Sequence, residues 1–477
     1  MTDVAAHPIG IGRVSASAAS HHLWPTLCVT LVALLVIASP NLIDPMIRFD
    51  DYPALFADPT GYWHKTKDEG RWLGYLWHLR EVTTPAWLNH ALYQLCWATI
   101  AASLGALTFR GHENAGWFAA VAALLVLVSP SALLISLWFN TLLPGIALVA
   151  AYAVLAHFTS AITLRALMPV FVILSFMSYT NYPLLILTVA VLRTEDRSIR
   201  DLAILLALFV VSFAAAVLTV YAINYHIHGV FGVHVADWRN ATPASDLAGI
   251  VANSPVLAET VRDYVTKTTF HFEPAIYFHL GLLLGSTVIL LRRAPLEAAY
   301  LFAVMAVGVA ILLLQVLKMG LYVPTRACLI IWLIYALIVA RATHLVSLDR
   351  GLIGRMARNC ALLIIGSYGL QTIIHYSAYW AWQDDTRVLA ADLRTVEGRV
   401  VIADDVLPLA SAQQAFILDT RGLAWRLKQL TGRDVAVCLD GLGCCAAADA
   451  GGAVVCPTRI HLEPSETGLV LKIRPPV

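Results

Sequence analysis

Charge is what this sequence lacks most. Only 13% of its 477 residues are charged and 59% are hydrophobic, whereas a soluble globular protein has about 25% charged residues. The formal net charge is +1 and no stretch is rich in lysine or arginine, so no nucleic-acid partner is expected. The composition argues against an ordinary soluble protein and indicates one whose surroundings are largely the lipid bilayer.

Several functional motifs are also absent. The sequence has no G-x-x-x-x-G-K-[ST] loop, which argues against an ATP-driven pump. It has no ladder of arginines of the kind that forms a voltage sensor, and no charged residue at the middle of an apolar run, where an ion pathway usually needs one. Internal repeats, which transporters often have, are not found either. These absences disfavour a transporter.

The apolar runs predict an all-α membrane domain over residues 23–380 with about eleven transmembrane helices. A spanning helix needs about 20 apolar residues. The break Ser178-Tyr-Thr-Asn-Tyr-Pro183 interrupts the run 161–192; it predicts a turn between two short helices or a kink in one long helix, and we favour the turn. The candidate spans are 23–43, 86–109, 116–139, 141–157, 161–177, 182–192, 202–221, 274–291, 296–317, 326–346 and 359–379.

Basic residues in the short loops give these helices a direction. Residues 1–22 are polar, so we expect a cytoplasmic N-terminal tail before an uncleaved first span. Arginines recur in alternate short loops, which predicts that those loops are cytoplasmic. They are Arg110, Arg193, Arg197, Arg200, Arg292, Arg293, Arg350, Arg355 and Arg358. The longer segments 44–85, 222–272 and 381–477, and the connection 318–325, would then lie outside.

Residues 381–477 predict a small soluble α/β domain. Strands are expected at 399–403, 434–438 and 468–473, and a helix at 411–430. In an oxidising compartment the cysteines of this segment would form one or two disulfides. Free thiols and a metal site are the alternatives, although C-x5-C-C-x10-C is not a usual zinc spacing. These cysteines are Cys438, Cys444, Cys445 and Cys456.

Two adjacent carboxylates, Asp50 and Asp51, directly follow the first predicted span. Charges so close to hydrocarbon are costly unless they are paired or used. In a functional role they would act as a general base or a cation ligand at the membrane surface. The structural alternative is a solvated pair that ends the helix and is neutralised by Arg48 or Arg71.

A second polar cluster is expected on the same side of the membrane, at Lys318, Tyr322 and Arg326. Its cations would bind the phosphate of a lipid, because arginine offers a bidentate fork and lysine a point charge. The alternative is that both side chains reach ordinary phospholipid headgroups.

Further candidates for substrate binding lie in the two long outer segments. Asp237, Trp238 and Arg239 would stack on and hydrogen-bond a sugar, or would belong to the aromatic belt at the membrane surface. The first long segment adds residues of the same kinds, namely Tyr52, His64, Lys65, Glu69 and Trp72.

An acidic pair in this position resembles the C-type glycosyltransferase superfamily (GT-C), and more closely the bacterial O-antigen glucosyltransferases of the Gtr type. The resemblance covers residues 25–380 and leaves the C-terminal segment without a counterpart. It implies a GT-C-like fold in the bacterial inner membrane, with the long segments and the C-terminal domain in the periplasm. It is carried by Asp50-Asp51-Tyr52, Gly70-Arg71-Trp72-Leu73, the tyrosine-bearing break Ser178–Pro183, and Pro324-x-Arg326.

The resemblance also implies a reaction. A hexose such as glucose would pass from a polyprenyl-phosphate donor to a lipid-linked or surface polysaccharide, with inversion at the anomeric carbon. Asp50 or Asp51 would be the base, and Arg71, Lys318, Tyr322 and Arg326 would hold the donor phosphate. The sequence requires no cofactor, although a divalent cation, Mg or Mn, could bridge Asp51 and the phosphate.

The main alternative is an O-antigen or capsule polymerase or ligase, which is also a multi-span protein with long outer loops. Such enzymes usually depend on arginine and histidine in a large outer loop rather than on an acidic pair after the first span. A lipid or polysaccharide transporter is the next alternative.

Overall fold

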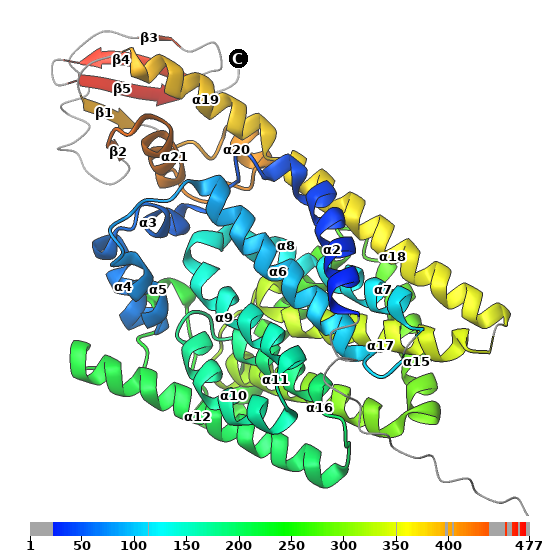
Figure 1. Ribbon diagram of the computed structural model, residues 1–477. Helices are drawn as coiled ribbons and strands as arrows, with labels where there is room; N and C mark the ends of the chain where they lie inside the picture. Colours follow the sequence, from blue (N-terminus) through cyan, green and yellow to red (C-terminus); the bar gives the residue numbers. More distant parts are fainter. Residues whose placement is uncertain are drawn as a thin grey trace, which may run out of the picture.

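The computed structural model describes residues 22–112, 114–349, 351–395, 399–402, 405–437, 454–455, 460–465 and 468–473. These residues are largely helical, with one small sheet near the C-terminal end (Figure 1). Within them, seven helical segments are long and apolar enough to cross a membrane: Leu23–Asn41, Ala86–Thr108, Pro130–Phe158, Ile199–His228, Ala275–Arg293, Pro295–Lys318 and Thr325–Ser347. The chain therefore has the helices of an integral membrane protein, and the count of about eleven spans stays a prediction.

The first half of the membrane part is a bundle joined mostly by short turns. It consists of α2 (Leu23–Ala38), η1 (Ser39–Asn41), α6 (Ala86–Thr108), α7 (Gly116–Leu127), α8 (Pro130–Ile135), η3 (Ser136–Trp138), α9 (Phe139–Phe158), α10 (Ala161–Phe176), α11 (Tyr182–Arg193) and α12 (Ile199–His228). The long first connection, residues 44–85, folds into η2 (Phe49–Asp51), α3 (Tyr52–Leu55), α4 (Pro59–Glu69) and α5 (Trp72–His78).

The second half begins with another long connection, residues 229–274, which contains η4 (Asp237–Arg239), α13 (Leu247–Ala252) and α14 (Ser254–Thr268). The bundle then continues with α15 (Ala275–Arg293), α16 (Pro295–Leu313), the π-helix η5 (Leu314–Lys318), η6 (Thr325–Cys328), α17 (Leu329–Ser347) and α18 (Leu352–Ser377).

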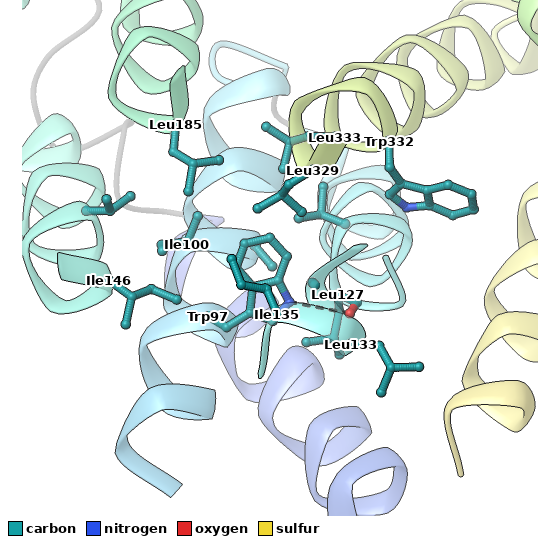
Figure 2. Close-up of a cluster of buried hydrophobic side chains, with 14 of the residues drawn as sticks. Trp97, Ile100, Leu127, Leu133, Ile135, Ile146, Leu185, Leu329, Trp332 and Leu333 are labelled. Carbon is teal, nitrogen blue, oxygen red and sulfur yellow. Dashed lines mark hydrogen bonds between the residues drawn. The ribbon is translucent and has the colours of Figure 1, made fainter. Parts of the chain in front are cut away.

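The core lies where α6, α9, α11 and α17 meet the short helices α7 and α8 (Figure 2). Leucine, isoleucine and tryptophan side chains fill this space. Trp97 donates a hydrogen bond to the carbonyl of Leu127 at 3.4 Å, and Trp332 donates one to the carbonyl of Leu125 at 2.9 Å. Both tryptophans thus satisfy carbonyls that the C-terminal end of α7 leaves free. Gly105 allows close packing, because a Cβ there would lie 2.4 Å from the Ala119 carbonyl oxygen.

The predicted single span over 116–139 is wrong. Helix α7 ends at Leu127, and α8 begins at Pro130. Pro130 has no N–H for a continuing helix, so it favours the first turn of a new one. The Ser129 side chain caps that turn by accepting from the Ala132 N–H at 3.3 Å. The membrane-crossing candidate in this region is instead Pro130–Phe158, which joins α8, η3 and α9.

The predicted break within 161–192 is confirmed, because α10 and α11 are separate helices joined by a turn. Pro183 lies in the first turn of α11, where proline is well tolerated. Asn181 in the turn donates to the carbonyl of Ala327 at 2.9 Å. The turn is therefore fastened to η6, which lies almost 150 residues further along the chain.

Ion pairs show that the short basic loops meet at one end of the bundle. Arg110 pairs with Glu195 at 2.7 Å, Arg197 with Glu297 at 3.8 Å, and Arg293 with Asp349 at 2.5 Å. These pairs join the end of α6 to the α11–α12 connection, that connection to the start of α16, and the end of α15 to the end of α17. The loops that were predicted to share one side of the membrane therefore share one end of the bundle; which side that end faces stays a prediction.

The C-terminal segment consists of α19 (Trp380–Arg394), β1 (Arg399–Ile402), α20 (Ala410–Gln414), α21 (Arg421–Thr431), β2 (Val435–Val437), β3 (Val454–Val455), β4 (Ile460–Ser465) and β5 (Gly468–Ile473). The sheet has the order β2-β1-β5-β4-β3; β1 runs parallel to β2 and β5, and β4 runs antiparallel to β5 and β3. The three predicted strands are present as β1, β2 and β5. The four cysteines of this segment lie outside the described residues.

The predicted helix over 411–430 is wrong, because it is two helices separated by residues 415–420. Phe416 has a φ of +53°, which ends α20. The Asp419 carboxylate accepts from the Arg421 N–H at 2.8 Å, in the turn that leads into α21. Thr420 braces the turn by donating to Asp405 at 2.5 Å.

The C-terminal segment packs on the first connection, with α21 next to η2 (Figure 1). Asp44 accepts hydrogen bonds from Arg426 at 2.7 Å and from Arg387 at 3.0 Å. The ring of Trp425 packs against those of Tyr52 and Phe56, with centroids 6.5 and 5.8 Å away, and these two rings also contact each other. An ion-pair clasp and an aromatic stack thus hold the two parts together.

The clasp predicts a large effect of Asp44→Asn. Arg426 is almost fully buried, and loss of its charged partner should lower the free energy of unfolding by about 3 kcal/mol. Thermal unfolding of the purified chain, together with protease sensitivity of the C-terminal segment, would measure this. Asp384→Asn is the matched control, because Asp384 also pairs with Arg387 but is exposed; its effect should stay under about 0.5 kcal/mol. Equal effects of the two variants would contradict the clasp.

Candidate functional site

Asp51 is fully buried and fastens the first connection to the start of α9. One carboxylate oxygen accepts from the Thr141 N–H at 2.7 Å; the other accepts from the backbone N–H and the side-chain amide of Asn140, at 3.0 and 2.9 Å. Burial raises the pKa of Asp51 to about 7, against the effect of these donors. Because both oxygens are used inside the protein, Asp51 is a structural anchor and does not face a substrate.

Asp50 points the other way and is still accessible. Its carboxylate accepts from Lys65 Nζ at 3.1 Å and from Trp138 Nε1 at 2.7 Å, and its side chain is 35% exposed. Burial acts to raise the pKa of Asp50, but the charge and hydrogen bond of Lys65 and the hydrogen bond of Trp138 outweigh it and hold the pKa below its usual value. Asp50 is therefore the member of the acidic pair that is ionised at neutral pH and open to a ligand.

Two guanidinium groups lie against Trp138, the residue that hydrogen-bonds Asp50. The Cζ of Arg326 is 4.4 Å from the centre of the ring, and that of Arg48 is 5.8 Å from it. Within the part of the chain that the structure describes, no carboxylate lies within 4.0 Å of either guanidinium. Arg48 donates to the carbonyl of Phe416, and its buried Nε has no hydrogen-bond partner among the described residues. The site thus has excess positive charge.

Arg71 lies nearby but is neutralised. It forms an ion pair with Glu69, which Arg239 also approaches at 3.5 Å. Its guanidinium lies 5.8 Å from the centre of the Tyr179 ring, in the turn between α10 and α11. The charge of Arg71 helps to lower the pKa of Asp50, so Arg71 borders the same site, and Glu69 links Arg71 to Arg239.

Lys318 and Tyr322 form contacts that fix the chain just before Arg326. Lys318 donates to the carbonyl of Ala244, and its own carbonyl accepts from the Ala244 N–H at 2.8 Å. Asp263 of α14 accepts from the backbone N–H and the hydroxyl of Thr325, at 3.1 and 2.7 Å, and also bonds Tyr322. These contacts fix the start of η6, where Arg326 lies.

The other predicted substrate residues are scattered. Tyr52 is buried against Trp425, and Trp72 is buried and donates to Asn224 at 2.8 Å. His64 and Asp237 are exposed, and the side chain of Trp238 lies outside the description. Of this set, Lys65, Glu69 and Arg239 are close to the site.

Two site residues were missed from the sequence. Arg48 was considered only as a partner for the acidic pair, and Trp138 is hidden at the end of an apolar run, where an aromatic residue is expected to be core. The spacing between Trp138 and Asp50 carries no signal, because a contact over 88 residues depends on how the helices pack.

The proposed bridging of a divalent cation by Asp51 does not fit this geometry, because both oxygens of Asp51 accept N–H hydrogen bonds. Asp50, its neighbour, is bound to Lys65 and Trp138. Among the described residues there is no group of three or more His, Cys, Asp and Glu side chains that could hold a metal ion.

No protein family, curated protein or solved structure matches this chain. The function is therefore argued from the site itself.

The titration of Asp51 predicts a pH-dependent stability. Because its pKa is raised from 3.8 to about 7 in the folded chain, its contribution is present below pH 4 and is lost as the pH rises through about 7. Asp51→Asn removes this titration. Between pH 4 and 7, the melting temperature of the wild type should therefore fall steadily relative to that of Asp51→Asn as the pH rises. A constant difference across that range would contradict the assignment.

Proposed function

We propose that this chain is a membrane glycosyltransferase of the GT-C type. It would move a sugar, a hexose such as glucose, from a polyprenyl phosphate to a lipid-linked or surface polysaccharide. One observation carries the proposal: an accessible, ionised carboxylate, Asp50, lies beside Trp138 and two guanidinium groups that have no carboxylate partner in the described residues. A base next to guanidinium groups that can bind a phosphate is what glycosyl transfer from a phosphate requires.

The chemistry follows from these groups. An acceptor hydroxyl attacks the anomeric carbon and loses its proton to Asp50. The bond between the anomeric carbon and the phosphate oxygen breaks, and the phosphate leaves with the bonding electrons. Arg48 and Arg326 stabilise the negative charge that develops on it. Direct attack inverts the anomeric carbon.

The position of the site suits a lipid-linked donor. Asp50 follows the membrane-crossing candidate Leu23–Asn41, and Arg326 lies at the start of the candidate Thr325–Ser347. Groups at the ends of spanning helices lie at the depth of lipid headgroups. A polyprenyl phosphate could place its phosphate there while its chain stays in the bilayer.

The topology belongs to the same proposal. The N-terminal tail is placed in the cytoplasm of a bacterium, and the site and the C-terminal segment in the periplasm, where disulfides between the four cysteines are possible. The arginine pairs at the opposite end of the bundle support this orientation. A reporter fused after Arg197 should then read as cytoplasmic.

The proposal predicts that Asp50→Asn abolishes transfer. Loss of the base should lower kcat at least a hundredfold, and Arg326→Gln should also lower kcat/KM by a hundredfold or more. The assay is transfer of radiolabelled glucose from undecaprenyl phosphate glucose to purified lipopolysaccharide by the chain in detergent. Asp68→Asn, in the same connection and similarly part-buried, is the control and should be active.

Full activity of Asp50→Asn would remove the proposed base. A wild type that uses only an oligosaccharide pyrophosphate donor would instead favour the polymerase or ligase alternative.

Asp263 predicts a second, separable effect. It does not face the anion site but fixes Thr325 beside Arg326. Asp263→Asn should raise the KM for the donor by about three- to tenfold, in line with the loss of one or two hydrogen bonds to a charged group, and leave the KM for the acceptor unchanged. Glu259→Gln, an exposed change on the same helix, should alter neither constant. An equal rise in both KM values would argue against a role confined to Arg326.

A further inference from the structure

The C-terminal segment reaches the candidate site through one turn. Residues 415–420 separate α20 from α21, and the backbone carbonyl of Phe416 accepts a hydrogen bond from Arg48. Arg48 lies on Trp138, and Trp138 donates to Asp50 at 2.7 Å. Two residues, Arg48 and Trp138, therefore link the proposed base to Phe416.

Phe416 is held in an unfavourable backbone conformation. Its φ of +53° lies in the left-handed region, which bulky side chains rarely adopt. Hydrogen bonds on both sides of the residue fix it, from the Phe416 N–H to the Gln413 carbonyl at 3.1 Å and from the Ile417 N–H to the Ala412 carbonyl at 2.8 Å. Such conformations persist where the surrounding structure imposes them, and they gather at ligand-binding sites.

The conformation presents the ring of Phe416 as a flat surface. One face stacks on His375, with an interplanar angle of 16° and centroids 6.1 Å apart. Phe416 is nevertheless 51% exposed, so the rest of its ring is open. An aromatic ring backed on one side and open on the other can stack against the apolar face of a sugar ring.

The turn is also fixed relative to the site. The clasp between Asp44 and Arg426 joins α21 to the first connection six residues before Asp50. Arg421, at the start of α21, lies 5.6 Å from the centre of the Phe49 ring. A small hollow beside the turn is lined by Arg48, Phe49 and Ile417, among others, so polar and apolar groups both border the ring.

We propose that Phe416 is a binding platform for one sugar ring of the glycan acceptor, next to the sugar whose hydroxyl faces Asp50. This inference rests on the proposed function, because it names the part of the chain that holds the acceptor. It gives the C-terminal segment a direct role in substrate binding. The alternative is that the exposed ring inserts into the membrane surface, and the tests below distinguish this from sugar binding.

The first test is kinetic. In the transfer assay from undecaprenyl phosphate glucose to lipopolysaccharide, Phe416→Ala should raise the KM for lipopolysaccharide about tenfold, with kcat and the donor KM unchanged. Phe416→Leu, which keeps the apolar bulk but not the flat face, should do the same, and Phe416→Tyr should restore the wild-type value. Phe231→Ala removes another exposed ring, 65% exposed and packed on Tyr221, and should change nothing.

The second test needs no transfer. Delipidated polysaccharide from the same lipopolysaccharide is added to the full chain carrying Asp50→Asn, and saturation transfer from protein to sugar protons is measured by NMR. Signals should be present and should be lost on adding Phe416→Ala. Melting temperatures of all variants identify any that fail to fold, in which case Phe416→Leu and Phe416→Tyr carry the comparison.

The outcomes separate the two proposals. An unchanged KM for lipopolysaccharide in Phe416→Ala and Phe416→Leu, with active transfer, overturns the platform and leaves the glycosyltransferase proposal standing. If sugar binding depends on Phe416 but the wild type transfers no sugar, the platform is supported, and the proposed transfer from a polyprenyl phosphate donor is contradicted. If Phe416→Ala binds the sugar as before but associates more weakly with phospholipid vesicles, the ring contacts the membrane. That result overturns the platform.

Discussion

The hydrogen bonds between Asp51 and the first turn of α9 are the constraint on which the rest of the site depends. Three N–H groups from Asn140 and Thr141 converge on one buried carboxylate. They fix η2 on the bundle, and η2 also carries Asp50. Because Trp138 directly precedes α9, the same junction brings its indole to Asp50. One anchor thus sets the positions of Asp50, the proposed base, and of Trp138, which hydrogen-bonds Asp50 and is approached by the two guanidinium groups.

Several arginines outside the site pair with a carboxylate, which gives a comparison for Arg48 and Arg326. Arg341 binds Glu297 at 2.8 Å, Arg165 binds Asp201 at 2.6 Å, and Arg426 binds Asp44 at 2.7 Å. A buried charge is costly unless a partner compensates it. Within the described residues Arg48, Arg326 and Arg80 have no such carboxylate; Arg80 donates to two carbonyls instead, and Arg48 and Arg326 both lie next to Trp138. Under the proposed function, the phosphate of the donor compensates the charge of Arg48 and Arg326.

The C-terminal segment is part of this arrangement. Asp44, Tyr52 and Phe56 of the first connection bind α19 and α21 on one side, while Asp51 binds α9 on the other. The stretch with Arg48 and Asp50 is thereby held between two rigid parts. A short segment that carries charged groups at a membrane surface gains its fixed geometry from such packing, because it has little apolar area of its own to bury.

The sequence by itself determined the membrane-protein character, the break between α10 and α11, the strands β1, β2 and β5, and the acidic pair after the first span, because each depends on local composition. Tertiary structure decided which carboxylate is available. Asp50 and Asp51 are chemically alike, but neighbours in a 3₁₀ turn point about 120° apart, so one meets the N-terminus of α9 and the other faces outward. Tertiary structure also gave Lys318 and Arg326 different partners, Ala244 and Trp138, and brought Arg48, Trp138 and Phe416 together. Contacts across 88 or 368 residues depend on the packing of helices and leave no pattern in the sequence.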